Sequence, residues 1–311
     1  MMLTRKGFAD ALIEIGEQDE KLVVLDADLS KSTLTSLFKE RFPDRHFNVG
    51  IAEQNLINVA GGLSLTGLTP FVSTYGVFLA GRAWEQIRTS VCYGKLNVKF
   101  GGAHGGISVG PDGATHQALE EIAIMRVIPE MKICVPADYY ETKKAVKASM
   151  EIDGPVYIRF GREKVPVVTS EDHDFEFGKA YKLKEGKDVS VIACGTMVSE
   201  ALDAAEALKS EGVDVEVVNL HTIKPIDADT IVETARKTGC IVTAEEHQKN
   251  GGMGSAVMEV LAQNYPVPVE MVGINDTFGE SGSPSELMEK YGITSKNIIE
   301  MVKKVLTRKK S

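Results

Sequence analysis

The sequence predicts an α/β protein of two domains, each a mainly parallel sheet flanked by helices. Short β-branched runs alternate with amphipathic stretches along most of the 311-residue chain. This alternation is typical of parallel strands connected by helices that cover both faces of a sheet. It weakens only across the polar, acidic segment 163–179 and then restarts. We therefore expect a first domain over 1–162, a linker over 163–179 and a second domain over 180–311.

The first domain begins with an amphipathic helix that carries Phe8, Leu12 and Ile15 on one face. The expected strands are LVVLD, HFNVG, TPFVST, NVKFGG, MKICVPA and PVYIRF, in that order. Helices are expected over EQNLINVAGGLSLTG (53–67), GRAWEQIRTSVCY (81–93) and DYYETKKAVKASM (138–150).

The second domain repeats the pattern with the strands DVSVIACG, VEVVNL, CIVTAEE and PVEMVGI. Two of its helices end at glycines, Gly212 and Gly239, which suit a helix C-terminus. The run NGGMGSAVMEV follows a strand and resembles a dinucleotide fingerprint, but Val257 stands where the third glycine belongs. We therefore expect a turn into a helix packed closely on the sheet. A final helix ends in a basic tail.

Composition narrows the class of protein. The balance of 43% hydrophobic and 25% charged residues is that of a globular protein. The net charge of −9 argues against nucleic acid as a partner, because phosphate backbones need basic patches. A few local arginines can still bind an anionic substrate. No apolar run approaches the roughly 20 residues of a membrane span, and the first residues lack a signal-peptide core. We expect no membrane partner and a cytoplasmic location.

Four cysteines occur without any CxxC pair. Cys134, Cys194 and Cys240 lie in or beside apolar strand-like runs, and Cys92 lies within the helix predicted over 81–93. Cysteine is among the most buried residue types, so all four are expected to be buried free thiols.

The segment 101–117, GGAHGGISVGPDGATHQ, is the strongest candidate for a ligand-binding loop. It holds His104, Asp112 and His116 among six glycines and follows a predicted strand. Ligands of parallel sheets bind beyond the carboxyl ends of the strands. Histidines there can donate hydrogen bonds or protons to a polar substrate, and this interpretation is favoured. A metal site and a plain surface loop remain open alternatives.

Other candidate residues have simpler explanations beside the functional one. Glu53 begins a predicted helix, where an acid stabilises the helix dipole. Arg162 follows a strand and can clamp a phosphate, but it and Arg5 can equally be solvated charges. Tyr75 and Phe78 follow a strand end, where aromatic side chains are more often core than a platform for a ring.

These motifs together resemble the C-terminal half of transketolase, a thiamine diphosphate enzyme that moves two-carbon ketol units. The similarity covers essentially the whole chain. The strings that carry it, in the family's order, are TRKGFADAL, DADLSKSTLT, FNVGIAEQN, FVSTYGVF, VGPDGATHQ and IRFGRE. D-G-x-T-H-Q is the most specific. The resemblance implies a pyrimidine-binding domain, a C-terminal domain and ketol transfer between sugar phosphates of the pentose phosphate pathway.

The resemblance also implies roles for cofactor-binding residues. Glu53 matches the glutamate that hydrogen-bonds the pyrimidine ring and shares a proton with a ring nitrogen, a catalytic role. Tyr75 and Phe78 match aromatic positions that pack against the pyrimidine.

Substrate-binding residues follow from the same resemblance. His104 and His116 match catalytic residues that hydrogen-bond the substrate carbonyl and hydroxyls, and Asp112 matches the residue that contacts the hydroxyl next to the carbonyl. Arg5, Ser32 and Arg162 match the sugar-phosphate clamp, with His104 close by.

The family's diphosphate-binding half is not found in the sequence. No GDG followed by an asparagine in the usual metal-binding context occurs, and Asp112-Gly113 is preceded by proline. The resemblance therefore implies a separate N-terminal transketolase subunit that holds the diphosphate and Mg²⁺. No metal ligand is expected in this chain, and the assembly expected is a heterotetramer, a dimer of heterodimers.

Alternatives remain within and outside the family. 1-Deoxyxylulose-5-phosphate synthase shares similar strings but is normally one long chain. The β-chain of 2-oxoacid dehydrogenases has a suitable length but usually lacks D-G-x-T-H-Q. A non-catalytic scaffold and a simple nucleotide-binding module are further hypotheses. Pro111 and Ala114 depart from the usual residues around Asp112, which leaves the loop's shape and the substrate preference open.

Overall fold

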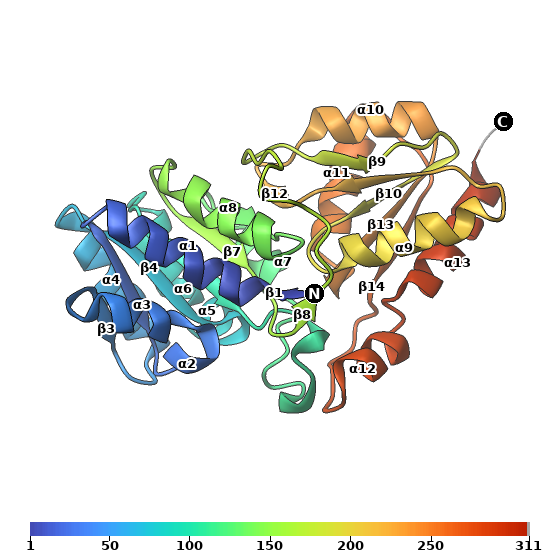
Figure 1. Ribbon diagram of the computed structural model, residues 1–311. Coiled ribbons are helices and arrows are strands. Elements are labelled where there is room, and N and C mark those ends of the chain that lie inside the picture. Colours follow the sequence, from blue (N-terminus) through green and yellow to red (C-terminus); the bar gives the residue numbers. More distant parts are fainter. Residues whose placement is uncertain (310–311) are drawn as a thin grey trace.

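A seven-stranded sheet organises the first part of the computed structural model, which describes residues 1–309 (Figure 1). The strand order is β12-β6-β7-β5-β4-β2-β3, and all neighbours are parallel except the edge pair of β12 and β6. The central strands β2, β4, β5 and β7 are buried along their whole length, as expected for a sheet with helices on both faces. The strands are β2 (Leu22–Asp26), β3 (His46–Asn48), β4 (Thr69–Tyr75), β5 (Lys99–Ala103), β6 (Lys132–Cys134), β7 (Val156–Arg159) and β12 (Thr222–Lys224).

Two hydrophobic clusters cover the two faces of this sheet. On one face, α1 (Thr4–Gln18) and α8 (Tyr139–Met150) pack against each other and contribute Phe8 and Ala145 to a cluster with Phe71 of β4. On the other face, the helices are α4 (Glu53–Leu65), α5 (Gly76–Arg82) and α7 (Glu121–Arg126). Shorter helices complete this part: α2 (Ser30–Thr33), α3 (Thr35–Arg41) and the 3₁₀ turn at Pro43–Arg45.

A five-stranded sheet in the order β14-β13-β10-β11-β9 forms the second part. It is parallel except for β9 at one edge. The strands are β9 (Tyr181–Lys184), β10 (Val189–Ala193), β11 (Val215–Asn219), β13 (Ile241–Gln248) and β14 (Val269–Ile274). The helices are α9 (Met197–Lys209) and α13 (Ser295–Arg308) on one face, and α10 (Ala228–Thr238) and α11 (Met253–Asn264) on the other. The predicted fold class, two mainly parallel sheets flanked by helices, is confirmed.

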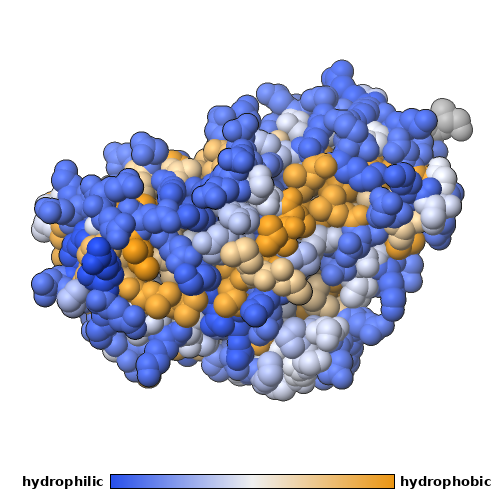
Figure 2. All heavy atoms as spheres, in the orientation of Figure 1, coloured by the Kyte–Doolittle hydropathy of each residue, from blue (hydrophilic) through white to orange (hydrophobic). Residues whose placement is uncertain are grey.

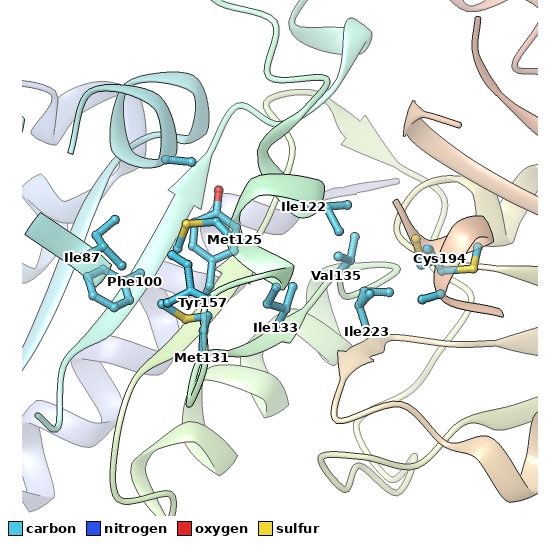
Figure 3. Packing of buried hydrophobic residues seen from close by; sticks show 14 of the residues in the cluster. Ile87, Phe100, Ile122, Met125, Met131, Ile133, Val135, Tyr157, Cys194 and Ile223 are labelled. Carbon is cyan, nitrogen blue, oxygen red and sulfur yellow. The ribbon is translucent and has the colours of Figure 1, made fainter. Parts of the chain in front are cut away.

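The two sheets share a hydrophobic core rather than standing apart. One cluster of buried residues runs from Phe100 and Tyr157 of the first sheet through Ile133 to Ile223 and Cys194 (Figure 3). The strand β12 belongs to the second part of the sequence but pairs antiparallel with β6 of the first sheet. The two domains are therefore held together by the pairing of β12 with β6 and by apolar packing.

The segment 163–179, predicted as a linker, carries regular contacts. Within it β8 (Lys164–Val165) pairs antiparallel with β1 (Met2–Leu3). Asp138, the N-cap of α8, accepts backbone hydrogen bonds from Val168 and Thr169 at 2.7 and 2.6 Å. The segment therefore ties the N-terminus and α8 together as it passes between the domains.

The helix predicted over 81–93 is divided in the structure. α5 ends at Arg82, α6 covers Trp84–Gln86, and Ile87–Cys92 forms a π-helix in which the Tyr93 amide bonds the Arg88 carbonyl at 2.9 Å. The Trp84 indole donates a hydrogen bond to the Ile124 carbonyl at 2.8 Å. This bond anchors α6 to α7. The periodicity of apolar residues did not predict the division, because π-helical turns are rare and short.

Hydrophilic side chains cover most of the face drawn in Figure 2, with apolar patches between them. None of the helices in the described part of the chain is long and apolar enough to cross a membrane. All four cysteines are buried free thiols, as the sequence predicts. The glycines of NGGMGSAVMEV allow the close packing expected there, since a Cβ at Gly254 would lie 2.6 Å from the Thr243 hydroxyl of β13.

Candidate active site

The candidate residues gather where β4 and β5 end. Tyr75 is the last residue of β4, and His104 directly follows β5, its parallel neighbour. Their rings stack with centroids 4.1 Å apart. This is the edge of a parallel sheet at which ligands bind.

His104 is buried, and one nitrogen of its ring lacks a hydrogen-bond partner among the described residues. Its φ of +57° is unusual for a residue with a side chain, and its exposure is 1%. Burial lowers the pKa of His104 to about 3, helped by the positive charges of Arg5 and Arg162. Its Nδ1 has no hydrogen-bond partner within residues 1–309. His104 is therefore a neutral imidazole with a buried nitrogen that lacks a hydrogen-bond partner among residues 1–309. A bound ligand could supply that partner.

Aromatic rings surround His104 on one side. Phe78 of α5 stacks with Tyr75 at 5.7 Å, and His116 meets Phe78 edge-on at 5.2 Å and Tyr75 at 6.0 Å. The structure thus brings both histidines and both predicted aromatic residues into one cluster. Such a wall can pack against a flat heteroaromatic ring.

Two arginines lie beside this cluster. Arg5, at the start of α1, donates to the Ser32 carbonyl at 2.8 Å, while its Nε has no partner in the described part of the chain. Arg162 forms an ion pair with Asp112 at 3.1 Å and donates to the Val109 carbonyl. Burial lowers the pKa of Arg5, and the nearby charge of Arg162 adds to the effect. Two guanidinium groups therefore lie together at this site, with the carboxylates of Asp112 and Glu163 beside Arg162 as counter-charges.

Glu53 joins the cluster through an arginine that the sequence analysis missed. Glu53 is the first residue of α4 and is 4% exposed. Its Oε1 accepts a hydrogen bond from the Arg82 guanidinium at 3.2 Å. The Arg82 guanidinium lies over the Phe78 ring, 3.9 Å from its centroid. No sequence signal singles out Arg82, because its importance comes from the contact between α4 and α5.

The loop that carries the histidines is held by a glutamine and by the second domain. Ile107–Asp112 forms a 3₁₀ turn with a kink at Gly110, where φ is +78°. The buried Gln117 amide donates to the carbonyls of Ile107, Gly110 and Glu280 at 2.9 to 3.3 Å. The amide group of this glutamine, from the D-G-x-T-H-Q string, therefore shapes the loop.

The structure brings together all nine predicted site residues, either directly or through Arg82. Ser32 takes part through its backbone carbonyl, and none of the side-chain hydrogen bonds found in residues 1–309 involves its hydroxyl. Within the same residues, no group of three or more histidine, cysteine, aspartate or glutamate side chains is arranged to hold a metal ion.

Comparisons with known proteins assign the family. Residues 1–168 match the family model of the transketolase pyrimidine-binding domain, and residues 178–298 match that of the transketolase C-terminal domain. The chain therefore belongs to the transketolase family, and it spans these two domains. Dependence on thiamine diphosphate is implied for members of this family.

Relatives of similar length are transketolase sections and subunits. The chain is 47% identical to a protein of Methanocaldococcus jannaschii assigned as a transketolase C-terminal section, covering 96% of this chain and 94% of that protein. It is 42% identical to a 6-deoxy-6-sulfo-D-fructose transketolase subunit of a Clostridium species, covering 98% and 95%. A solved structure described as a split gene transketolase, inactive beta4 tetramer, is 54% identical, covers both chains completely and superposes with a TM-score of 0.94.

Proposed function

We propose that this chain is the C-terminal subunit of a transketolase. Together with a separate N-terminal subunit it transfers a two-carbon ketol unit from a ketose phosphate to an aldose phosphate. The observation that carries the proposal is the convergence of Glu53, the aromatic wall, two histidines and two arginines at the ends of β4 and β5. The resemblance of the whole chain to a split-gene transketolase subunit supports it.

The residues at this site fit the pyrimidine ring of thiamine diphosphate. Glu53 is a buried carboxylate whose partner Arg82 is half exposed, so the carboxylate can exchange that partner for a ring nitrogen. Tyr75 and Phe78 provide a stacked aromatic surface beside it. Thiamine diphosphate supplies the stabilisation of a carbanion, while Glu53 holds a proton at the ring nitrogen and Tyr75 and Phe78 orient the ring.

The remaining polar residues suit a sugar phosphate. His104 is neutral, so its imidazole can donate one hydrogen bond and accept another from a substrate carbonyl or hydroxyl. His116 and Asp112 would contact the hydroxyls. Arg5 has a guanidinium nitrogen without a partner among residues 1–309, and Arg162 lies beside it. The two arginines, with Ser32 next to them, therefore suit the phosphate group.

A partner subunit would hold the diphosphate and Mg²⁺, and two such pairs would form a dimer of heterodimers. The proposal is supported by the 54% identical chain, which is described as a split gene transketolase whose beta4 tetramer is inactive. The choice of sugar is a finer question. One relative is a subunit for a sulfo-sugar, and a pair of arginines binds a sulfonate as well as a phosphate.

Ketol transfer from xylulose 5-phosphate to ribose 5-phosphate, with thiamine diphosphate and Mg²⁺, tests the proposal. The chain is assayed alone, with a co-expressed N-terminal subunit, and as Glu53→Ala in that pair. We expect activity only in the intact pair. Decarboxylation of pyruvate by the pair would instead place the protein with the synthase or the 2-oxoacid dehydrogenases. Transfer from a sulfo-sugar alone would keep the ketol transfer and change the substrate.

A further inference from the structure

Two adjacent glutamates on β13 bind different parts of the molecule. Both are buried, with exposures of 0% for Glu245 and 2% for Glu246. Side chains of successive strand residues point to opposite faces of a sheet. Glu245 accepts the backbone N–H groups of Met253 and Gly254 at the start of α11, at 2.7 and 2.8 Å. Glu246 reaches away from its own domain to the loop of the candidate active site, where its Oε1 accepts the N–H of Ser108 at 2.6 Å.

The rest of Glu246 is fixed by its surroundings. Its second carboxylate oxygen accepts from the Thr196 hydroxyl at 3.1 Å, and its backbone carbonyl accepts from Arg159 at 2.7 Å. Arg159 also forms a buried ion pair with Glu121. Burial alone would lower the pKa of Arg159, but the charges of Glu121 and Glu246 overcome that effect and raise it. The carboxylate therefore stands at a fixed position from which one oxygen holds the loop.

The loop lies directly against this carboxylate. Gly106 has a φ of +94°, and a Cβ on it would lie 2.2 Å from the carboxyl carbon of Glu246. Ser108 stands midway between His104 and Asp112 in the sequence, inside the segment whose ends carry the substrate-facing side chains. The hydrogen bond at Ser108 thus restrains both halves of the loop.

We propose that Glu246 is a positioning residue for ketol transfer. From the C-terminal domain it holds the backbone of the loop that presents His104, Asp112 and His116 to the substrate. The proposal gives the C-terminal domain a part in the reaction, and it rests on the proposed function of that site. Because Glu246 does not contact Glu53, Tyr75 or Phe78, its loss should affect the sugar phosphate more than the cofactor.

Three substitutions distinguish the effect of the length of the Glu246 side chain from the effect of its charge. Glu246→Asp keeps the charge beside Arg159 but withdraws the carboxylate from Ser108 by one methylene. Glu246→Gln loses the charge but keeps an acceptor for Ser108 and a donor for Thr196. Glu245→Asp is the matched control, since it shortens the neighbouring buried glutamate, which binds α11 instead of the loop.

Amide hydrogen exchange of the full chain is the first readout, and it does not depend on activity. We expect Glu246→Asp to speed amide exchange in the peptide 105–113 about tenfold or more, and Glu246→Gln to change it less than about threefold. Glu245→Asp should instead speed exchange in the peptide 252–256, at the start of α11. Equal effects of Glu245→Asp and Glu246→Asp on 105–113, or a larger effect of Glu246→Gln than of Glu246→Asp, would overturn the proposal.

Kinetics of the assembled pair give the second readout. We expect Glu246→Asp to raise KM for the ketose phosphate about tenfold or more, with the dissociation constant of thiamine diphosphate changed less than about twofold and with recovery in Glu246→Gln. An unchanged KM in a variant whose loop exchanges faster would contradict the positioning role. If the pair shows no ketol transfer at all, the proposed function fails, while the exchange experiment still decides whether Glu246 holds the loop.

Discussion

Two carboxylate–arginine pairs in this molecule share a buried carboxylate and differ in the arginine. In the Glu121–Arg159 pair the side chains are 2% and 6% exposed, and Arg159 also donates to two backbone carbonyls. In the Glu53–Arg82 pair the carboxylate is 5% exposed but the arginine is 51% exposed and lies on the face of Phe78. The first pair lies within the first domain, and its arginine also reaches the second domain through the Glu246 carbonyl. The second can open, because its arginine is already solvated, and so it leaves a buried carboxylate available to a ligand.

Removing the buried arginine should have the largest effect on stability. Arg159→Met leaves the Glu121 carboxylate buried without its partner, which costs about 3–5 kcal/mol of the free energy of unfolding. Urea denaturation at one fixed chain concentration measures it, since self-association would otherwise shift the midpoint. A loss below about 1 kcal/mol would show that this pair is no more important to the fold than a surface pair.

Neutralising the other buried carboxylate should act on catalysis instead. Glu53→Gln keeps the shape of the side chain but cannot share a proton with a ring nitrogen, so ketol transfer by the assembled pair should fall about 100-fold or more. Its free energy of unfolding should stay within about 1 kcal/mol of the unaltered chain, because Arg82 remains solvated. Steady-state rates and urea curves of the same preparation check both. Full activity would remove Glu53 from the reaction.

The buried histidine of the site should make stability depend on pH. The pKa of His104 is about 3 in the folded chain against 6.5 in the unfolded chain, so the unfolded state binds more protons between these values. Its contribution to stability is complete above pH 6.5 and is lost as the pH falls toward 3.

His104→Asn removes this contribution. Across that window the slope of the free energy of unfolding against pH should decrease by up to about 1.4 kcal/mol per pH unit. His221 keeps its own contribution in the variant, because its pKa is lowered in the same way by burial. Parallel curves for the two proteins would show that His104 is not buried as a neutral imidazole.

The exposed arginine should contribute least to stability. Arg82→Ala breaks the ion pair with Glu53 and the contact with Phe78, but exposed ion pairs contribute only about 0–1 kcal/mol. The change in the urea midpoint should be correspondingly small. A loss comparable to that of Arg159→Met would mean that Glu53 needs Arg82 to stay folded and is not free to bind a ligand.

Local sequence patterns were sufficient to predict the fold class. The alternation of β-branched runs with amphipathic segments predicts both sheets, because the apolar side chains that each strand or helix buries recur at its own period in the sequence. Edge pairings were not predicted. Thr222–Lys224 joins the first sheet across the domain boundary and Lys164–Val165 pairs with the N-terminus, since short strands of two or three residues carry no periodicity of their own.

Site residues could be predicted from the sequence where they belong to a recognisable motif. His104, Asp112 and His116 came from one glycine-rich string, and the structure places them together. Arg82 and Glu246 were missed because each acts through a contact between elements distant in sequence. Glu246 lies 138 residues from Ser108, and nothing in the strand CIVTAEE distinguishes it from Glu245. The two glutamates have different roles only because successive side chains of the strand point to opposite faces of the folded sheet.

Binding of thiamine diphosphate with Mg²⁺ to the chain alone and to the co-expressed pair, measured by isothermal titration calorimetry, tests the central claim most directly. The claim is that this chain supplies the pyrimidine and sugar-phosphate side of a site that a partner completes. We predict saturable binding by the pair, weakened by Glu53→Gln, and no saturation by the isolated chain up to about 1 mM. Equal affinity of the isolated chain and the pair would contradict the account.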